Sequence, residues 1–211
     1  MIREDNEWTN LFWDTAWDDT RRRIFLIGDS ITVNYRQAVQ DWLYENNTGV
    51  SVDLYGTARC IVDPMYHNEL NYMLSTVGHT YDVIHFSNGL HGKDLEPRRT
   101  YLTPEEYESG VRQAIESMKK FQPQARIILA TVTPMTKPGA DIHVDKDYNF
   151  FVYERNEVIH RLAEEYHLDI DDLFTEVAEN PAYAQDDGLH FTLPGSKLLG
   201  ARIAKMMYEM M

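Results

Sequence analysis

The sequence predicts a single three-layer α/β/α domain, flavodoxin-like, with about five parallel strands. Short apolar runs rich in β-branched residues alternate with longer stretches of helical period, the pattern of parallel strands joined by helical crossovers. The runs at residues 24–27 and 127–130 are apolar without interruption, as expected for strands covered on both faces. A length of 211 residues fits one domain and would be cramped for two.

The expected strands lie at residues 23–27, 50–54, 83–86 and 126–132, with a short fifth strand near 168–170. The expected helices lie at about 35–45, 65–76, 104–121 and 148–167, and a last helix follows Pro194. Thr103 followed by Pro104 is a good start signal, because threonine can cap a helix and proline favours its first position. We see no repeat or linker, so residues 21–211 are expected to form one α/β domain.

Residues 1–20 differ from the rest, because aromatic side chains stand among acidic ones. Trp8, Phe12, Trp13 and Trp17 fall mostly four and five residues apart. This spacing favours an amphipathic turn or two packed on the domain. The alternative is a wall of the active site or of a subunit contact, since both places are rich in aromatic residues.

The composition excludes several classes of protein. The chain has 34 acidic and 20 basic residues, a net charge of −14, whereas nucleic acids and anionic membrane surfaces attract clustered lysine and arginine. No apolar stretch approaches the ~20 residues that span a bilayer, and the first residues lack the apolar core of a signal peptide. We therefore expect a cytoplasmic protein, or a secreted one if a leader has been removed. The single cysteine, Cys60, excludes an internal disulfide and is expected to be a small buried hydrophobe.

The first chemical motif is Gly28-Asp29-Ser30, at the end of the first expected strand. Ligands bind beyond the carboxyl ends of the strands in an open parallel sheet. A glycine and two small polar residues make a tight turn that would expose the Ser30 hydroxyl at the amino end of the next helix, where backbone N–H groups attract an anion. The alternative is that Asp29, Ser30 or Thr32 only caps the helix.

The second motif is Asp187-Gly188-Leu189-His190, just before the last helix. An aspartate three residues before a histidine in a turn can accept a hydrogen bond from one imidazole nitrogen, which leaves the other nitrogen free to act as a base. Ser30 and His190 are 160 residues apart, and both stand at loop positions. The two motifs are therefore expected to meet at one edge of the sheet.

Two further loops carry candidate donors for an oxyanion. Asn88 follows the third expected strand, where its side-chain amide can donate to a developing negative charge. Gly56 follows the second, where a glycine lets its own backbone N–H approach the same anion. The plain alternatives are an Asx-turn at Asn88 and an ordinary turn at Gly56.

Together these motifs resemble those of the SGNH hydrolases, the GDSL-type family of esterases and lipases. Gly28-Asp29-Ser30 is similar to the first block of the family, and Asp187 with His190 to the last. The resemblance extends from about residue 23 to the C-terminus. It implies that Ser30 is the nucleophile, that His190 is the base, and that Asp187 orients the imidazole.

The resemblance also implies an oxyanion hole made by the backbone N–H groups of Ser30 and Gly56 and by the Asn88 amide. No metal or organic cofactor is implied. The chain departs from the family pattern where Phe86 and Gly89 flank the third block, and where Arg59 stands in place of a second glycine.

The run from Asn88 to Gly92 is similar to a variant among bacterial members, many of them assigned to carbohydrate de-esterification. It implies hydrolysis of short acyl esters, first of all acetyl esters of carbohydrates, so the expected partner is a small-molecule or oligosaccharide ester. A lysophospholipase or thioesterase activity stays open. So do homo-oligomerisation and a non-catalytic flavodoxin-like domain that binds a small ligand at the same strand ends.

Weaker substrate-binding candidates are Asp29, Arg59 and His91, with a surface ion pair as the alternative for Arg59. His85, inside the third strand, is expected to be a satisfied core histidine. The three arginines at residues 21–23 are expected to be solvated at the start of the first strand, on the side away from the site.

The polar segment at residues 134–147 is expected to be a loop at the rim of the site. It contains Asp141, His143 and Asp145 at alternate positions. Such a set can suggest a metal site, but flanking proline and glycine favour a solvated loop.

Overall fold

The computed structural model describes residues 6–92, 102–136 and 144–211. Its centre is a six-stranded sheet with the strand order β1-β3-β2-β4-β5-β6. Neighbouring strands from β3 to β6 are parallel, and β1 joins β3 in the antiparallel direction. The strands are β1 Thr9–Phe12, β2 Arg23–Gly28, β3 Ser51–Thr57, β4 Val83–Ser87, β5 Arg126–Ala130 and β6 Asp169–Asp171.

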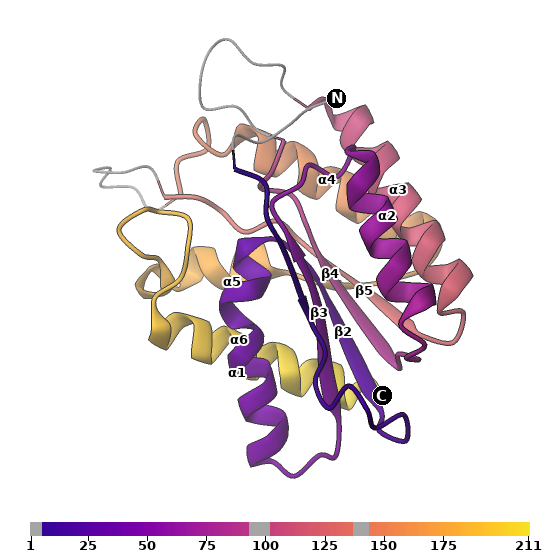
Figure 1. Ribbon diagram of the computed structural model, residues 1–211. Helices are drawn as coiled ribbons and strands as arrows, with labels where there is room; N and C mark the ends of the chain where they lie inside the picture. Colours follow the sequence, from indigo (N-terminus) through magenta and orange to yellow (C-terminus); the bar gives the residue numbers. More distant parts are fainter. Residues whose placement is uncertain (1–5, 93–101, 137–143) are drawn as a thin grey trace.

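Helices cover both faces of this sheet (Figure 1). The α-helices are α1 Ser30–Glu45, α2 Pro64–Asn71, α3 Pro104–Phe121, α4 Phe150–Tyr166, α5 Leu173–Glu179 and α6 Leu193–Glu209. A π-helical turn, Tyr72–Thr76, extends α2, and a 3-10 turn, Pro181–Tyr183, follows α5. Side chains of α2, α3 and α4 share one core with the sheet, and those of α1, α5 and α6 share the other. The predicted three-layer α/β/α architecture is confirmed.

The central strand β2 explains why a continuous apolar run is needed. All of its residues are buried. Phe25 and Ile27 belong to the core beneath α2, α3 and α4, whereas Ile24 and Leu26 belong to the core beneath α1, α5 and α6. Successive strand side chains point to opposite faces, so a strand covered on both sides must be apolar at every position.

The N-terminal segment contains an edge strand in place of the amphipathic turns expected from the spacing of its aromatic residues. β1 pairs with β3 from Thr9 opposite Thr57 to Phe12 opposite Leu54. Phe12 packs on the α1 side of the sheet, and Leu11 on the α2 side. The neighbouring apolar residues Leu11 and Phe12 therefore lie on opposite faces of the sheet, which is the period of a strand.

Two helices also differ from the expectation. α1 begins at Ser30, five residues before the predicted start, because Asp29 caps it by accepting a hydrogen bond from Ile31 N at 3.0 Å. α5 was not predicted at all. It is only seven residues long, and such a short element carries little periodic signal.

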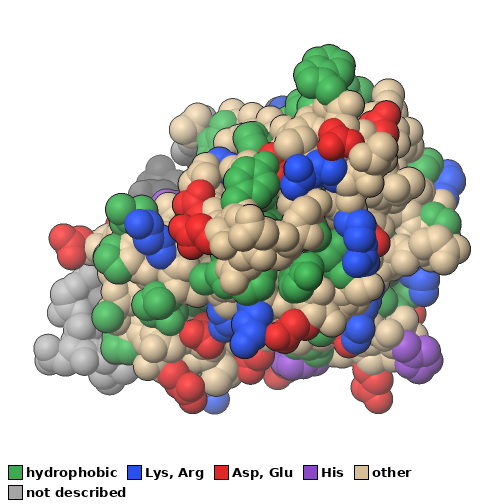
Figure 2. Space-filling model, turned by 90° about the horizontal axis from the view of Figure 1, so that it is seen from below, with side chains coloured by type: hydrophobic (Ala, Val, Ile, Leu, Met, Phe, Trp, Pro, Cys, Tyr) green, Lys and Arg blue, Asp and Glu red, His purple; other side chains and the backbone are tan. Residues whose placement is uncertain are grey.

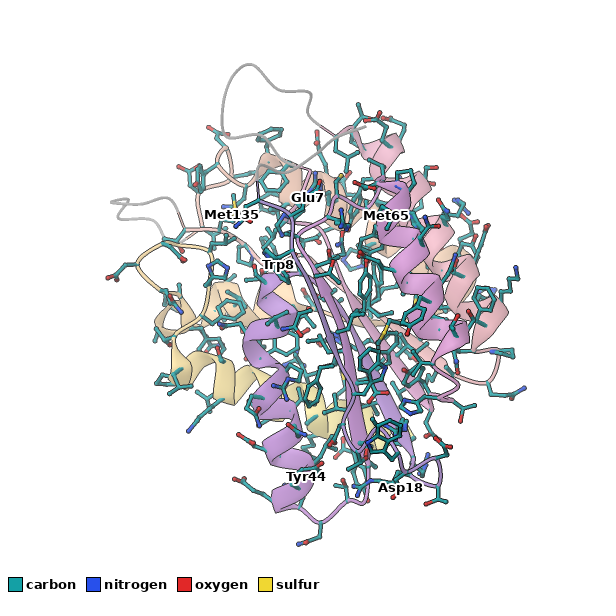
Figure 3. The ribbon with its side chains drawn as sticks, in the orientation of Figure 1. Glu7, Trp8, Asp18, Tyr44, Met65 and Met135 are labelled. Atoms are coloured by element: carbon teal, nitrogen blue, oxygen red, sulfur yellow. The ribbon has the colours of Figure 1, made fainter. Side chains whose placement is uncertain are left out.

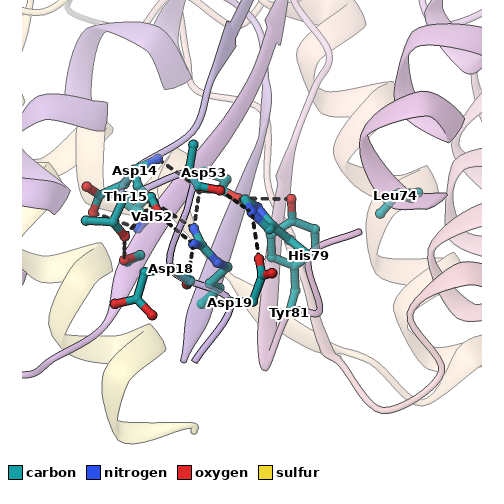
Figure 4. A network of polar contacts seen from close by, with 12 residues as sticks. Asp14, Thr15, Asp18, Asp19, Val52, Asp53, Leu74, His79 and Tyr81 are labelled. Carbon is teal, nitrogen blue, oxygen red and sulfur yellow. Dashed lines mark hydrogen bonds and ion pairs between the residues drawn. The ribbon is translucent and has the colours of Figure 1, made fainter. Parts of the chain in front are cut away.

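A buried polar network lies at the end of the sheet where the parallel strands begin (Figure 4). Arg23 forms an ion pair with Asp53 at 3.1 Å, and His79 Nδ1 lies 2.7 Å from the same carboxylate. Tyr81 donates its hydroxyl proton to Asp53 at 3.1 Å. The expectation of a solvated arginine run is therefore wrong for Arg23, which is only 1% exposed, because a buried carboxylate and backbone carbonyls satisfy its charge.

The two ends of the sheet differ in their surroundings. Trp8 and Met135 lie at the end where the parallel strands finish, and Asp18 and Tyr44 lie at the opposite end (Figure 3). Seen from below, that opposite end carries acidic and basic side chains interspersed with hydrophobic ones (Figure 2). Within the described part of the chain, no helix combines the length and the apolar character needed to cross a membrane.

Candidate active site

The turn from β2 to α1 exposes Ser30 at the finishing end of the central strand. Gly28 is tightly enclosed: a Cβ there would lie 2.0 Å from Thr32 Oγ1 and 2.4 Å from the carbonyl oxygen of Ser87. Only glycine lets the strand pass this close to β4 before the helix begins. Ser30 is then the first residue of α1 and is half-buried.

The turn before α6 carries the second half of the site. Asp187 Oδ1 accepts hydrogen bonds from the backbone N–H groups of Leu189 and His190, both at 2.9 Å. Gly188 has a φ of +70°, and a Cβ there would lie 2.0 Å from the carbonyl oxygen of Thr136. The turn therefore needs glycine both for its backbone conformation and for its contact with the segment after β5.

The two turns meet as the motifs predicted. His190 Nε2 lies 2.9 Å from Ser30 Oγ, and His190 Nδ1 lies 2.7 Å from Asp187 Oδ2. When Nδ1 carries the proton, it donates a hydrogen bond to the Asp187 carboxylate. The unprotonated Nε2 then faces Ser30 as a hydrogen-bond acceptor. Partial burial acts to raise the pKa of Asp187, but the hydrogen bonds from His190 and the two N–H groups outweigh it and lower the pKa.

Asn88 directly follows β4, whose last residue, Ser87, lies opposite Gly28 of β2. Its side chain is 3% exposed, and its Nδ2 has no hydrogen-bond partner among the described residues. Its own backbone carbonyl accepts a hydrogen bond from the Tyr107 hydroxyl at 2.5 Å. A buried amide donor without a partner is rare in folded proteins, and a donor of this kind is able to bind a developing negative charge.

Gly56 does not lie where the family resemblance implied. It belongs to β3 itself, opposite Asn10 of β1. Ala58, two residues farther along, donates its N–H to the Trp8 carbonyl of the same N-terminal segment at 3.0 Å. Residues two apart on a strand direct their N–H groups to the same side, so the Gly56 N–H faces β1. The geometry therefore does not support Gly56 as an oxyanion donor; the glycine instead lets α1 approach, since a Cβ would lie 2.4 Å from Val33 Cγ2.

The three weaker candidates for substrate binding have different surroundings. Arg59 forms ion pairs with Glu7 at 2.7 Å and with Glu69 at 3.3 Å, which is the surface-ion-pair alternative. Asp29 is 3% exposed and engaged in capping α1. Burial raises the pKa of Asp29, and the nearby His91 partly opposes the shift. His91 is half-buried beside this carboxyl.

Two residues that no sequence motif marked support the loop after β4. Tyr107, on α3, holds the Asn88 carbonyl, and Arg155, on α4, donates to the carbonyls of Gly89, His91 and Gly92. An arginine in a helix with charged neighbours is normally solvated, so the sequence contained no signal for it.

His85 is buried in β4, as expected, with its Nε2 3.0 Å from Asp171, but its Nδ1 has no hydrogen-bond partner among the described residues. Cys60 is buried, as expected. Of the alternating set Asp141, His143 and Asp145, the first two fall outside the described residues. Within the described ranges, no group of three or more histidine, cysteine or acidic residues is arranged to hold a metal ion.

No family model and no curated protein sequence matches the chain. Solved structures are similar in fold. A lipase/acylhydrolase from Enterococcus faecalis is 20% identical with a TM-score of 0.67, over 89% of this chain and 96% of the other. A carbohydrate acetylesterase from Sinorhizobium meliloti is 15% identical with a TM-score of 0.69, over 90% and 100%. A mutant acetyl-xylooligosaccharide esterase from Geobacillus is 18% identical with a TM-score of 0.68, over 90% and 96%. The chain therefore has the fold of the SGNH (GDSL-type) hydrolases.

Proposed function

We propose that the protein is a serine ester hydrolase that uses Ser30, His190 and Asp187 as its catalytic triad. The observation that carries the proposal is the unbroken line of hydrogen bonds from Asp187 through His190 to Ser30, at 2.7 and 2.9 Å. Capping α1 would not require this line, because Asp29 already caps that helix. The fold shared with esterases and lipases supports the same conclusion.

The reaction is a two-step acyl transfer. His190 Nε2 takes the hydroxyl proton as Ser30 Oγ bonds to the ester carbonyl carbon. The backbone N–H of Ser30 and the Asn88 amide donate to the oxygen that becomes negative. His190, held by Asp187 in its charged form, then gives the proton to the leaving alcohol as its C–O bond breaks. A water molecule, activated by the same imidazole, attacks the acyl-Ser30 carbonyl and releases the acid with the serine restored.

We infer that the substrates are short acyl esters, first of all acetyl esters of carbohydrates. The run Asn88 to Gly92 supports this choice, as do the names of two proteins of the same fold, the carbohydrate acetylesterase and the acetyl-xylooligosaccharide esterase. The net charge of −14 disfavours strongly anionic substrates through long-range repulsion. Lysophospholipid and thioester substrates are the comparison set.

The test is turnover of p-nitrophenyl acetate and of acetylated xylooligosaccharides by the full chain and by Ser30→Ala. We expect the substitution to lower kcat by about 10⁴-fold or more, as loss of a triad nucleophile does elsewhere. Ser75→Ala is the matched control, because Ser75 is exposed and its hydroxyl contacts only its neighbours in the chain, the Asn71 carbonyl and the Thr76 hydroxyl.

A serine-directed phosphonate separates the competing functions. An adduct on Ser30, found by mass spectrometry of the peptide, accompanies loss of activity in the hydrolase. No turnover of any ester and no adduct would instead indicate a flavodoxin-like domain that binds a small ligand at these strand ends.

A further inference from the structure

We propose that Arg155 is a positioning residue that holds the loop after β4 so that the Asn88 amide reaches the oxyanion. The inference rests on the hydrolase function proposed above and extends it to a residue that does not touch the substrate. Arg155 lies on α4, and its side chain is among the largest that are fully buried, at 1% exposure.

The guanidinium binds the backbone of the loop. Nη1 donates to the carbonyl oxygens of Gly89 and of His91, the latter at 2.9 Å, and Nη2 donates to that of Gly92 at 3.2 Å. The Tyr107 hydroxyl donates a further hydrogen bond to the Asn88 carbonyl. Side chains of α3 and α4 therefore bind four of the five backbone carbonyls at residues 88–92. These contacts fix the path of the backbone whatever side chains the loop carries.

The loop is also fixed sterically on its other sides. A Cβ on Gly89 would lie 2.2 Å from Val132 Cγ2, and one on Gly92 would lie 2.5 Å from Cys60 Sγ. The guanidinium carbon of Arg155 lies 5.2 Å from the centre of the Tyr107 ring, so the two side chains that bind the loop also stack on each other. Asn88 therefore leaves β4 on a backbone with few alternative positions.

Asn88 depends on this backbone because nothing among the described residues holds its amide. Nδ2 has no hydrogen-bond partner there. The direction of the amide is set by the backbone and by packing, so a small shift of the loop moves the donor. Transition-state stabilisation of this type requires the donor within about 2.7–3.1 Å of the oxyanion, and a misplacement of 1 Å can cost 10²-fold in rate.

The experiment compares Arg155→Met, Arg155→Lys and wild type on p-nitrophenyl acetate. We expect Arg155→Met to lower kcat by about 10–100-fold with KM changed less than about threefold, since the lost contact acts in the transition state. Arg155→Lys should be intermediate, because an ammonium keeps the charge but lacks the planar fork that reaches several carbonyls. Tyr107→Phe, which keeps the ring and removes one hydrogen bond, should lower kcat by about 3–10-fold.

The decisive step repeats these substitutions in an Asn88→Ala background. A residue that acts through Asn88 has nothing left to position, so Arg155→Met should lower kcat there by less than about twofold. An undiminished further loss, or a wild-type kcat in both Arg155→Met and Tyr107→Phe, would overturn the proposal. If Arg155→Met does not fold, Tyr107→Phe carries the same test.

Arg23→Met is the matched control, because Arg23 is an equally buried arginine at the opposite end of the sheet. It should lose stability and keep its kcat. Wild-type protein without turnover and without a phosphonate adduct on Ser30 would remove the hydrolase function itself, and the positioning role with it. Active wild type with indifferent Arg155 variants would remove the positioning role alone.

Discussion

Asn88 keeps a polar donor out of water without a partner for it among the described residues. Such a group costs about 1–3 kcal/mol of folding free energy. We therefore expect Asn88→Ala to lower kcat by about 10²–10³-fold, the cost of removing one oxyanion donor, without lowering the melting temperature. Kinetics with p-nitrophenyl acetate measure the change in kcat, and thermal unfolding of the same preparation measures the melting temperature.

Asn156→Ala is the contrasting variant for that prediction. Its amide is fully used, because Oδ1 accepts from Val132 N at 2.7 Å and Nδ2 donates to Val132 O at 3.2 Å. Removing it leaves two buried backbone groups unpaired, so the melting temperature should fall. An Asn88→Ala protein with full kcat would transfer the oxyanion role to another donor.

The residues that the sequence predicted and those that it did not differ in a physical way. Ser30, Asp187 and His190 belong to short motifs whose local turns determine their orientation, so their contact at one edge of the sheet could be predicted without knowledge of the fold. Gly56 was misjudged because the direction of its N–H depends on the pairing of β1 with β3, which is a non-local contact. Arg155 and its carbonyl partners lie 63–66 residues apart, and no local pattern records such a contact.

At the scale of single elements, the turn from β2 to α1 makes a sharp prediction. A Cβ at position 28 would meet the Ser87 backbone at 2.4 Å, and that backbone leads directly to Asn88. We expect Gly28→Ala to lose about 1–3 kcal/mol of unfolding free energy and about 10²-fold in kcat, because both the nucleophile turn and the end of β4 must move. Urea unfolding and ester kinetics measure the two effects.

Gly49→Ala separates backbone strain from the active site. Gly49 has a φ of +72° and would place its Cβ in open space, away from the triad. This variant should lose about 1 kcal/mol, the cost of a left-handed conformation for alanine, at full kcat. Equal loss of activity in both variants would show that stability, not the position of Ser30, governs the rate.

The N-terminal element illustrates the limit of periodicity. Aromatic residues four and five apart suit one face of a helix, yet four residues of this segment form an antiparallel edge strand. Its partner is β3, whose backbone groups on that side would be unpaired without β1. The sequence of the N-terminal segment alone does not reveal these hydrogen bonds. Strands β2, β4 and β5 were predictable because their apolar runs reflect burial on both faces, which is a property of each strand alone. The short strand β6 has no such run, since two of its three residues are aspartates.

At the scale of the whole molecule, the proposed active site and a buried polar network lie at opposite ends of the sheet. Ser30, His190 and Asn88 lie where the parallel strands end. Arg23, Asp53 and His79 form a buried network where these strands begin. Burial raises the pKa of Asp53, so this carboxyl favours folding most when it is protonated and opposes it as the pH rises. Burial also raises the pKa of Asp29, which acts in the same direction, whereas Asp171 acts in the opposite direction. The response of the protein to acid is the sum of these contributions.

Asp171, at the end of β6, gives the clearest example of a carboxyl whose stabilisation of the fold is lost in acid. It is 3% exposed, with His85 Nε2 at 3.0 Å and a hydrogen bond from Arg202, which also pairs with Glu176. Burial alone would raise its pKa, but His85 and Arg202 outweigh burial and hold the pKa below the usual 3.8. The folded state therefore binds this proton less readily than the unfolded chain does. The stabilisation is complete well above pH 4 and is lost as the pH falls through the lower, folded-state pKa.

We expect Asp171→Asn to lower the melting temperature at pH 7 and to flatten its fall between pH 5 and pH 3, because the variant has no carboxylate to protonate there. Asp169→Asn is the matched control on the same strand. Asp169 pairs with Arg126 at 2.6 Å, but the two side chains are 35% and 48% exposed, so solvent screens the pair and its removal should change the curve little. Thermal unfolding of the three proteins across this pH range measures the difference. Melting curves of wild type and Asp171→Asn that run parallel down to pH 3 would contradict the assignment, since the acid sensitivity would then arise from other carboxyls.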